Sequence, residues 1–312
     1  MKRDLYTEIT DRIVAALEAG TKPWAPDWIA RSGPALRVGG EQYRGINQLL
    51  LYLAAADGGY SAQHWMTYKQ AQELDGQVRK GERSTMIVFF KTLEREEVDE
   101  ATGEERTVGI PMLRSYNVFN VEQIDGLPER FAPKPVQIVA GKARDEAAEA
   151  AIRSCGADIR EGGSRAFYQR SGDFVQLPGF ELFHSVGGFL ATMAHECVHW
   201  TGAPHRLDRT KGQTFGDRDY AFEELVAEIG AAFVMGRLGV AGDHFESHAA
   251  YIGSWIKALK DDKRMIFKAS SLAQAAADLV LANAGSAPVQ APAPARPAPA
   301  FAPAAAQLSL AI

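Results

Sequence analysis

The chain has 312 residues, of which 46% are hydrophobic and 23% charged, and its formal net charge is −5 at pH 7. This length can bury a large core and suggests two domains, whereas the negative net charge excludes a general electrostatic attraction to nucleic acid. With two cysteines, no leader and no apolar run of about 18 residues, the sequence argues against secretion and membrane spanning and predicts a cytoplasmic protein.

The N-terminal part predicts an α+β domain over residues 1–128. Apolar side chains spaced four residues apart indicate an amphipathic helix over residues 2–17. Residues 49–56 are almost continuously apolar and indicate a buried helix. An apolar strand at 86–90 is expected to pair with residues 106–121 as a long hairpin with a charged tip.

A proline-containing linker at residues 129–136 is expected to lead into a second domain, residues 137–284. Within that domain the pattern predicts a helix at 145–155 and a hairpin at 166–177, whose edge strand is a candidate for binding an extended peptide. Residues 285–312 are rich in Ala and Pro and are predicted to form a disordered tail, because this composition cannot build a core.

Residues 195–199 read His-Glu-Cys-Val-His, and the spacing indicates a metal site. An α-helix turns about 100° per residue, so His195 and His199 lie on one face and can hold a single ion. Glu196 lies beside the open coordination position, where its carboxylate can act as a general base. This pattern is typical of zinc peptidases. The competing interpretation is a chance match, and Cys197 is better explained as a small buried apolar residue than as a ligand.

Two candidates compete for the third ligand. His205 completes the pattern H-E-x-x-H-x-x-G-x-x-H, which is typical of metzincins. Glu224 and Glu228 lie four residues apart on a predicted helix at 220–236, and they resemble the E-x-x-A-D/N element of glutamate zincins. In that arrangement Glu224 is the ligand and Glu228 orients a ligating imidazole from the second layer. A solvated acidic stripe is the other interpretation of this helix. Glu224 is the preferred ligand and His205 stays open.

Aromatic and basic residues alternate in the N-terminal part, as binding of single-stranded DNA requires, because bases stack on rings and phosphates pair with cations. Many of the aromatic side chains are equally suited to the core, Tyr43 and Trp65 foremost. The candidate DNA contacts are Trp24, Arg44, Lys69, Arg79 and Lys80.

Six separate blocks carry a resemblance to a known family. The blocks are Tyr43–Asn47, Trp65–Ala71, Val78–Glu82, Tyr116–Ile124, His195–Gly202 and Tyr220–Leu225. In this order they resemble ArdC-type antirestriction proteins of conjugative plasmids and mobile elements, over about residues 1–285. Such proteins join an N-terminal single-stranded-DNA-binding domain, also found in plasmid TraC-type primases, to a zincin-like peptidase domain. The resemblance implies a plasmid-borne protein that protects incoming DNA from restriction, with Zn²⁺ or another divalent metal held by His195, His199 and a glutamate.

Two classes of function follow. In the first, the chain is a DNA-tethered metallopeptidase that cleaves a restriction-system or other host protein bound to exposed single strands. In the second, the metal site is structural, and the protein coats single-stranded DNA or sequesters a restriction subunit without proteolysis. Glu196 favours the enzyme, because a structural site has no use for a general base at that position.

Overall fold

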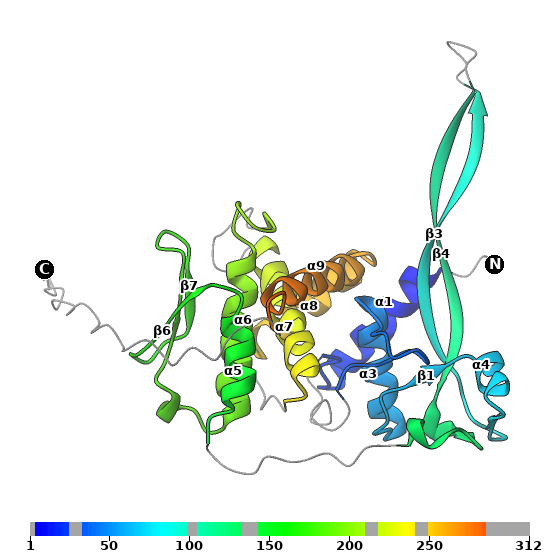
Figure 1. Ribbon diagram of the computed structural model, residues 1–312. Helices are drawn as coiled ribbons and strands as arrows, with labels where there is room; N and C mark the ends of the chain where they lie inside the picture. The colour runs from blue at the N-terminus through cyan, green and yellow to red at the C-terminus, as the bar shows by residue number, and fades with distance from the viewer. Residues whose placement is uncertain are drawn as a thin grey trace, which may run out of the picture.

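The structure is a computed structural model that describes residues 4–24, 33–98, 105–132, 143–209, 218–240 and 249–284. It confirms the expected α+β fold: a small sheet lies at one end, a group of helices in the middle, and a long β-hairpin at the other end (Figure 1). Part of the expected linker at 129–136 and all of the expected tail at 285–312 lie outside the described residues. Within the described ranges, no helix has the length and apolar content needed to cross a bilayer.

The N-terminal half has three described helices and five strands. They are α1 (Leu5–Glu18), α3 (Ile46–Gly58), α4 (Tyr68–Glu73), β1 (Trp65–Met66), β2 (Gln77–Val78), β3 (Thr85–Val98), β4 (Glu105–Asn120) and β5 (Ile124–Asp125), with short 3-10 helices at η1 (Val121–Gln123) and η2 (Glu129–Phe131). Local side chains explain the helix starts. Asp4 accepts hydrogen bonds from the amides of Tyr6 and Thr7 at α1. Thr67 and Gln70 form a capping box at α4.

The C-terminal half places helices beside a three-stranded sheet. Its elements are α5 (Glu146–Arg153), β6 (Asp158–Glu161), β7 (Phe167–Gln169), β8 (Phe174–Leu177), η3 (Phe180–Leu182), α6 (Val186–Thr201), α7 (Arg218–Leu238), α8 (Ala249–Asp261) and α9 (Met265–Val280). The predicted hairpin at 166–177 is confirmed as β7 and β8. The parallel neighbour of β8, β6, was not expected, because its sequence Asp-Ile-Arg-Glu contains a single apolar residue and no alternation.

The predicted hairpin of the N-terminal half is confirmed as β3 and β4. The two strands pair antiparallel over their whole length, from Thr85 opposite Val118 to Val98 opposite Glu105. The short strand β1 pairs with the end of β4. Among the described residues the hairpin meets the rest of the molecule at its foot, and its far end rises away from the helices (Figure 1).

The block at residues 43–47 fixes the foot of the hairpin to the helices. Asn47 donates from Nδ2 to the carbonyl of Val88 (2.6 Å), and its Oδ1 accepts from the Val88 amide (2.8 Å). Gly45, which has a positive φ of 55°, donates its amide to Gln274 of α9 (3.1 Å). A short segment thus connects β3 on one side with α9 on the other.

The core is continuous between the two halves. α7 packs against both α6 and α9, and Gly230 lies at the point of closest approach, where an added Cβ would come within 2.9 Å of Val198. The buried apolar cluster around these helices continues into α1 and α3, and α1 packs on α8. The segments that the sequence divides into 1–128 and 137–284 therefore bury apolar surface against each other.

This packing predicts that the second segment does not fold alone. Residues 137–284 expressed without the first half should lack a cooperative thermal transition. The apolar surface of this segment that α1 and α3 cover in the full chain would then be exposed to water. Circular dichroism and binding of a hydrophobic dye will measure this, with the full chain as control. A cooperative transition within a few degrees of that of the full chain would contradict the shared core.

Arg206 holds the loop that follows α6. Its Nε donates to the carbonyl of Trp200 (2.6 Å), and its guanidinium lies 3.9 Å from the centre of the Trp200 ring. The same guanidinium donates to Asp173 (3.0 Å) and Tyr168 (3.1 Å) of the β7–β8 hairpin. The hydrogen bond from Arg206 lowers the pKa of Asp173 to about 2. The loop after α6 is thereby bound to the sheet.

This ion pair predicts a pH-dependent contribution to stability. Because the pKa of Asp173 is lower in the folded state, its ionised form stabilises the fold at pH values above its unfolded-state pKa of about 4. This contribution is lost as the pH falls towards 2. Asp173→Asn should lower the free energy of unfolding at pH 7 by about 1 kcal/mol, and by less at pH 3. Urea unfolding at both pH values measures the difference. Asp158→Asn is the control, because Asp158 pairs with Arg160 at an exposed site of the same sheet. An equal loss of unfolding free energy at both pH values would argue against a stabilising ion pair between Asp173 and Arg206.

Candidate metal centre

The helix α6 carries the His-Glu-Cys-Val-His segment into the interior. The hydroxyl of Ser185 accepts from the amide of Gly188 (2.9 Å) and caps the start of the helix. Most of the following residues are buried against α7 and β8, and His195 is 4% exposed. Glu196 is also buried, at 9% exposure. Burying these polar side chains is costly unless a partner satisfies them.

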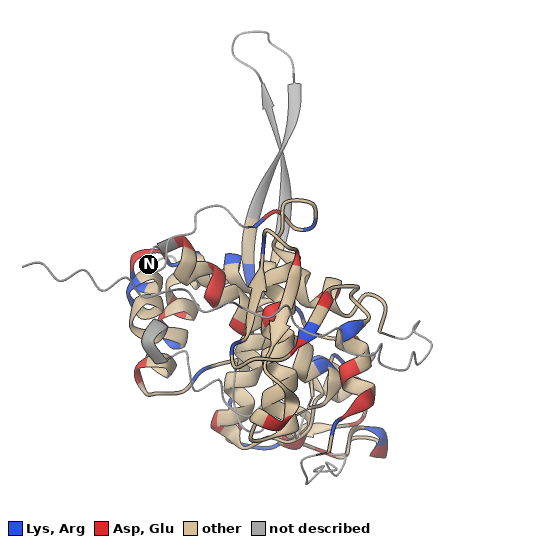
Figure 2. Ribbon diagram, turned by 90° about the vertical axis from the view of Figure 1, so that its left-hand side faces the viewer, with Lys and Arg blue, Asp and Glu red and all other residues tan. Residues whose placement is uncertain are grey.

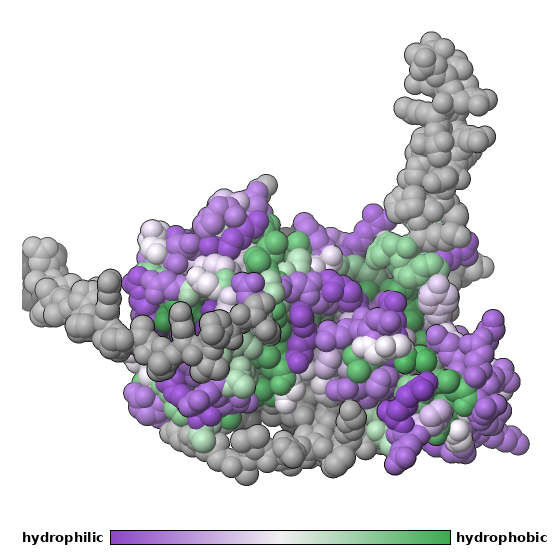
Figure 3. Space-filling view, in the orientation of Figure 1, coloured by the Kyte–Doolittle hydropathy of each residue, from purple (hydrophilic) through white to green (hydrophobic). Residues whose placement is uncertain are grey.

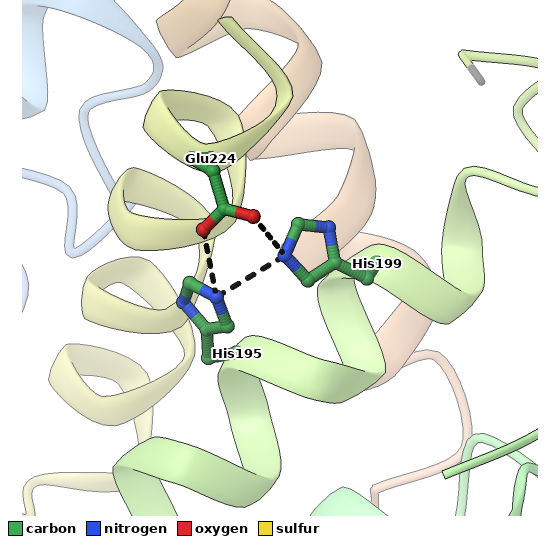
Figure 4. A group of neighbouring side chains, drawn as sticks. All are labelled: His195, His199 and Glu224. Atoms are coloured by element: carbon green, nitrogen blue, oxygen red, sulfur yellow. Dashed lines mark hydrogen bonds and ion pairs between the residues drawn. The ribbon is translucent and has the colours of Figure 1, made fainter. Parts of the chain in front are cut away.

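α7 brings one carboxylate to both histidines (Figure 4). Nε2 of His195 and Nε2 of His199 are 3.1 Å apart. The carboxylate of Glu224 places Oε2 3.5 Å from His195 Nε2 and Oε1 3.5 Å from His199 Nε2. Ligands that surround one tetrahedral ion at about 2.1 Å are about 3.4 Å from one another. The spacing and the N,N,O donor set therefore fit a divalent metal ion.

The structure does not bring His205 to this centre. The His205 side chain is 63% exposed, and its Nε2 lies 3.4 Å from a carboxylate oxygen of Asp173. The neighbouring Arg206 binds this part of the loop to the β7–β8 hairpin. Of the two candidates for the third ligand, the geometry assembles Glu224 with the two histidines.

A residue that the sequence analysis did not single out lies behind His199. The carboxylate of Glu223 places Oε1 3.4 Å from His199 Nδ1. Arg209, almost fully buried, donates to both oxygens of Glu223 (3.0 and 3.2 Å). Arg209 also donates to the carbonyl of Val198 (2.6 Å) and to the hydroxyl of Thr201 (2.8 Å) near the end of α6. The Glu223 carboxylate is thus held where it orients the imidazole through the ring nitrogen that faces away from the centre.

Glu228 lies elsewhere than the sequence analysis expected. Its side chain is fully buried, and its Oε2 accepts from Trp24 Nε1 (3.3 Å) and lies 3.8 Å from Lys22 Nζ. The expected second-layer role of Glu228 is corrected accordingly: Glu223 is the carboxylate found beside a ligating imidazole. Glu228 instead joins α7 to the segment that follows α1.

Trp24 is wrong as a DNA contact. Its exposed fraction is 0%, and its ring packs edge-on against Trp255 at 5.8 Å between centroids. A ring enclosed in the core cannot stack on a base. Tyr43 and Trp65 are core residues, as expected.

Three of the four basic candidates for DNA contact pair with carboxylates. Arg44 bonds to Asp278, Lys69 lies 3.7 Å from Glu73, and Arg79 bonds to Glu82 (2.7 Å) and Asp125 (3.4 Å). Lys80 is exposed and has no ion pair with any described residue. Segments with Lys or Arg (blue) and with Asp or Glu (red) are interspersed along the ribbon in Figure 2. Of the four basic candidates, the described ion pairs therefore leave Lys80 available for phosphate.

Opposite charges hold the metal centre together. Burial opposes the charged form of His199, but its hydrogen bonds to Glu223 and Glu224 outweigh burial and raise the pKa of His199 to about 10. Burial also opposes the charged forms of both glutamates, yet the contacts with the histidines, and with Arg209 in the case of Glu223, lower the pKa of each. The two carboxylates therefore favour positive charge on the imidazole between them, and Glu224, on the Nε2 side, is the one placed to bind a divalent ion.

Comparisons with known proteins cover both halves of the chain. Residues 3–119 match the family described as the N-terminal domain of anti-restriction factor ArdC, and residues 146–272 match a family of zincin-like metallopeptidases. The uncharacterized protein y4eC of Sinorhizobium fredii is 40% identical over 291 residues, which are 91% of this chain and 94% of y4eC. Two Escherichia coli proteins named DNA primase TraC are 38% identical over 90% of this chain, but the chain spans only 27% and 20% of their lengths.

Two crystal structures of the antirestriction protein ArdC from plasmid R388 are similar in fold. The metal-free form is 50% identical with a TM-score of 0.78, and the match covers 91% of this chain and 98% of that one. The Mn(II)-bound form is 47% identical with a TM-score of 0.76, and the match covers 91% and 99%. Because the likeness to ArdC in sequence and fold extends over both halves, the chain belongs to the ArdC family of antirestriction proteins.

Proposed function

We propose that this protein is a metal-dependent peptidase that binds single-stranded DNA and protects incoming DNA from restriction. The observation that carries the peptidase is the set of buried His195, half-buried His199 and buried Glu224, with Glu196 on the same helix as the two histidines. A purely structural metal has no use for a general base, and Glu196 is next to a ligating histidine but outside the ligand set.

Each residue of the centre has a task in peptide hydrolysis. His195, His199 and Glu224 would hold a divalent ion, which would supply a Lewis acid that polarises a carbonyl and lowers the pKa of water. Glu223 fixes the orientation of His199. Glu196 accepts the proton of the attacking water and passes it to the leaving amine. The protein therefore provides binding, orientation and proton transfer from α6 and α7 alone.

The DNA-binding half of the proposal rests on the relatives and on the composition of the N-terminal half. The matched region of the two TraC proteins, which are named as DNA primases, includes this half of the chain. Exposed cations without a described acidic partner, such as Lys80 and Arg114, are available for phosphate. A peptidase tethered to DNA meets proteins on the same strand at a high local concentration, so it needs little intrinsic substrate specificity.

Substitution of the proposed base tests the chemistry. Glu196→Gln should retain one bound divalent ion and lose proteolysis by at least about a hundredfold, because the amide cannot accept the proton. Cleavage of casein and self-cleavage, with and without single-stranded DNA, are the measurements, and metal content is measured on the same samples. Glu146→Gln, at an exposed position of α5, is the control.

The same variant separates the two classes of function. Equal proteolysis by Glu196→Gln and the wild type would remove the peptidase assignment. If the variant loses proteolysis but still protects transferred DNA as well as the wild type, antirestriction depends on DNA binding or sequestration instead.

The third ligand can be tested by metal affinity. Glu224→Ala should weaken Mn²⁺ or Zn²⁺ binding strongly, whereas His205→Ala should leave it unchanged, because His205 pairs with Asp173 outside the centre. Glu223→Gln should have an intermediate effect, a loss of about 10- to 100-fold. Isothermal titration calorimetry measures all three. Loss of metal in His205→Ala, with normal binding in Glu224→Ala, would reverse the assignment.

A further inference from the structure

Two aromatic rings stack on each other at the foot of the long hairpin. The ring centroids of Phe89 and Tyr116 are 4.3 Å apart and their planes differ by 6°. In the pairing register Tyr116 lies opposite Ile87 and Phe89 lies opposite Arg114, so the two rings form a diagonal pair across β3 and β4. Because side chains of directly opposed residues share a face of the sheet, all four residues lie on one face of the hairpin.

This face passes from the core into solvent at the stacked pair. Ile87 and Val118 are buried and pack with Trp65 under α3. One step further from the body Tyr116 is 49% exposed and Phe89 is half-buried. Hydrophobic surface is visible where the hairpin leaves the body (Figure 3). The rings therefore extend the packed face beyond the core and present aromatic surface to solvent.

The position of the rings is fixed from both sides. Asn47 holds the backbone of Val88, the residue next to Phe89, through two hydrogen bonds. On the other strand Tyr116 is paired in the ladder with Ile87, which is itself anchored in the core. A rigid ring loses little conformational freedom when it binds a flat ligand, so this arrangement is pre-organised.

A cation lies on the same face. Arg114 is exposed and stands opposite Phe89, and its guanidinium makes no hydrogen bond or ion pair with any residue that the structure describes. In this it differs from Arg44, Lys69 and Arg79, which are paired with carboxylates. An unpaired guanidinium beside stacked rings provides the two contacts that a nucleotide needs, one for the base and one for the phosphate.

We propose that Phe89, Tyr116 and Arg114 form a base-stacking site for single-stranded DNA. The proposal rests on the DNA binding proposed above and names the residues responsible for it. The two rings are already parallel, and an unpaired base extends such a stack by covering the outer ring face. Both faces of a base inside a duplex are occupied by its neighbours, so the site selects single strands. Arg114 receives the adjacent phosphate, and no base-specific contact is required.

The test uses the full-length protein and a 20-nucleotide oligo-dT that carries one 2-aminopurine, whose fluorescence falls when it stacks on an aromatic ring. The variant Phe89→Leu/Tyr116→Leu should bind at least about tenfold more weakly, by fluorescence anisotropy, and should lose the quenching. Arg114→Gln should keep the quenching and lower the slope of log K against log salt by about one. Phe90→Leu, at an exposed ring on the opposite face of β3, and Arg79→Gln, at a paired cation, are matched controls and should behave like the wild type.

The outcomes distinguish this site from the broader proposal. If the wild type does not bind the oligonucleotide, the proposed DNA function fails and the site fails with it. If the wild type binds and the double variant binds and quenches equally, DNA binding stands and the site is wrong. A loss in Phe90→Leu equal to that in the double variant also overturns the choice of face. If the double variant changes oligomeric state, measured by light scattering, and keeps its DNA affinity, the rings form a protein interface and the proposed DNA site is wrong. Tyr116→Leu alone provides the same test should the double variant not fold.

Discussion

Two neighbouring carboxylates on α7 approach opposite sides of one imidazole, and the arrangement of the metal centre depends on this contact. Glu224 faces Nε2 of His199 and Glu223 faces Nδ1. Adjacent residues of a helix point about 100° apart, so both can reach the ring only when α7 passes close to α6. Gly230 permits that approach, because any side chain there would meet Val198. Arg209 then neutralises Glu223 and binds the end of α6, so the charge behind the imidazole is compensated.

The same helix connects the metal centre with the N-terminal half. Glu228 follows Glu224 by about one turn, or about 6 Å along the axis, and it accepts a hydrogen bond from Trp24. Trp255, which packs on Trp24, donates to the carbonyl of Ala221 three residues before Glu224. The segment after α1 thus contacts α7 directly at Glu228, and it packs on Trp255, which contacts α7 on the other side of the ligand. The position of the third ligand is therefore set partly by residues outside the zincin-like region.

The sequence was informative where a local rule determines the geometry. The i, i+4 spacing of His195 and His199 is a property of the helix itself, and the hairpin strands follow from apolar runs separated by a turn. The sequence was wrong where the answer depends on the angle between two packed helices. Helical spacing made Glu228 the natural companion of Glu224, but periodicity cannot show which side of α7 faces His199. Glu223 is the residue before the predicted ligand, but the sequence does not show that its side chain faces His199.

Trp24 illustrates a second limit of sequence-based prediction. An aromatic residue in a loop with Lys and Pro can either stack on DNA or anchor the core, and the local sequence does not distinguish the two. Its role is decided by Glu228 and Trp255, which lie more than 200 residues away in the sequence. The cations Arg44 and Arg79 are ambiguous for the same reason, since their acidic partners come from other elements. Other basic side chains that the structure describes, such as Arg12 and Arg144, also have carboxylate partners. Affinity for a single strand can then draw on stacking on exposed rings as well as on contacts between phosphates and the unpaired cations.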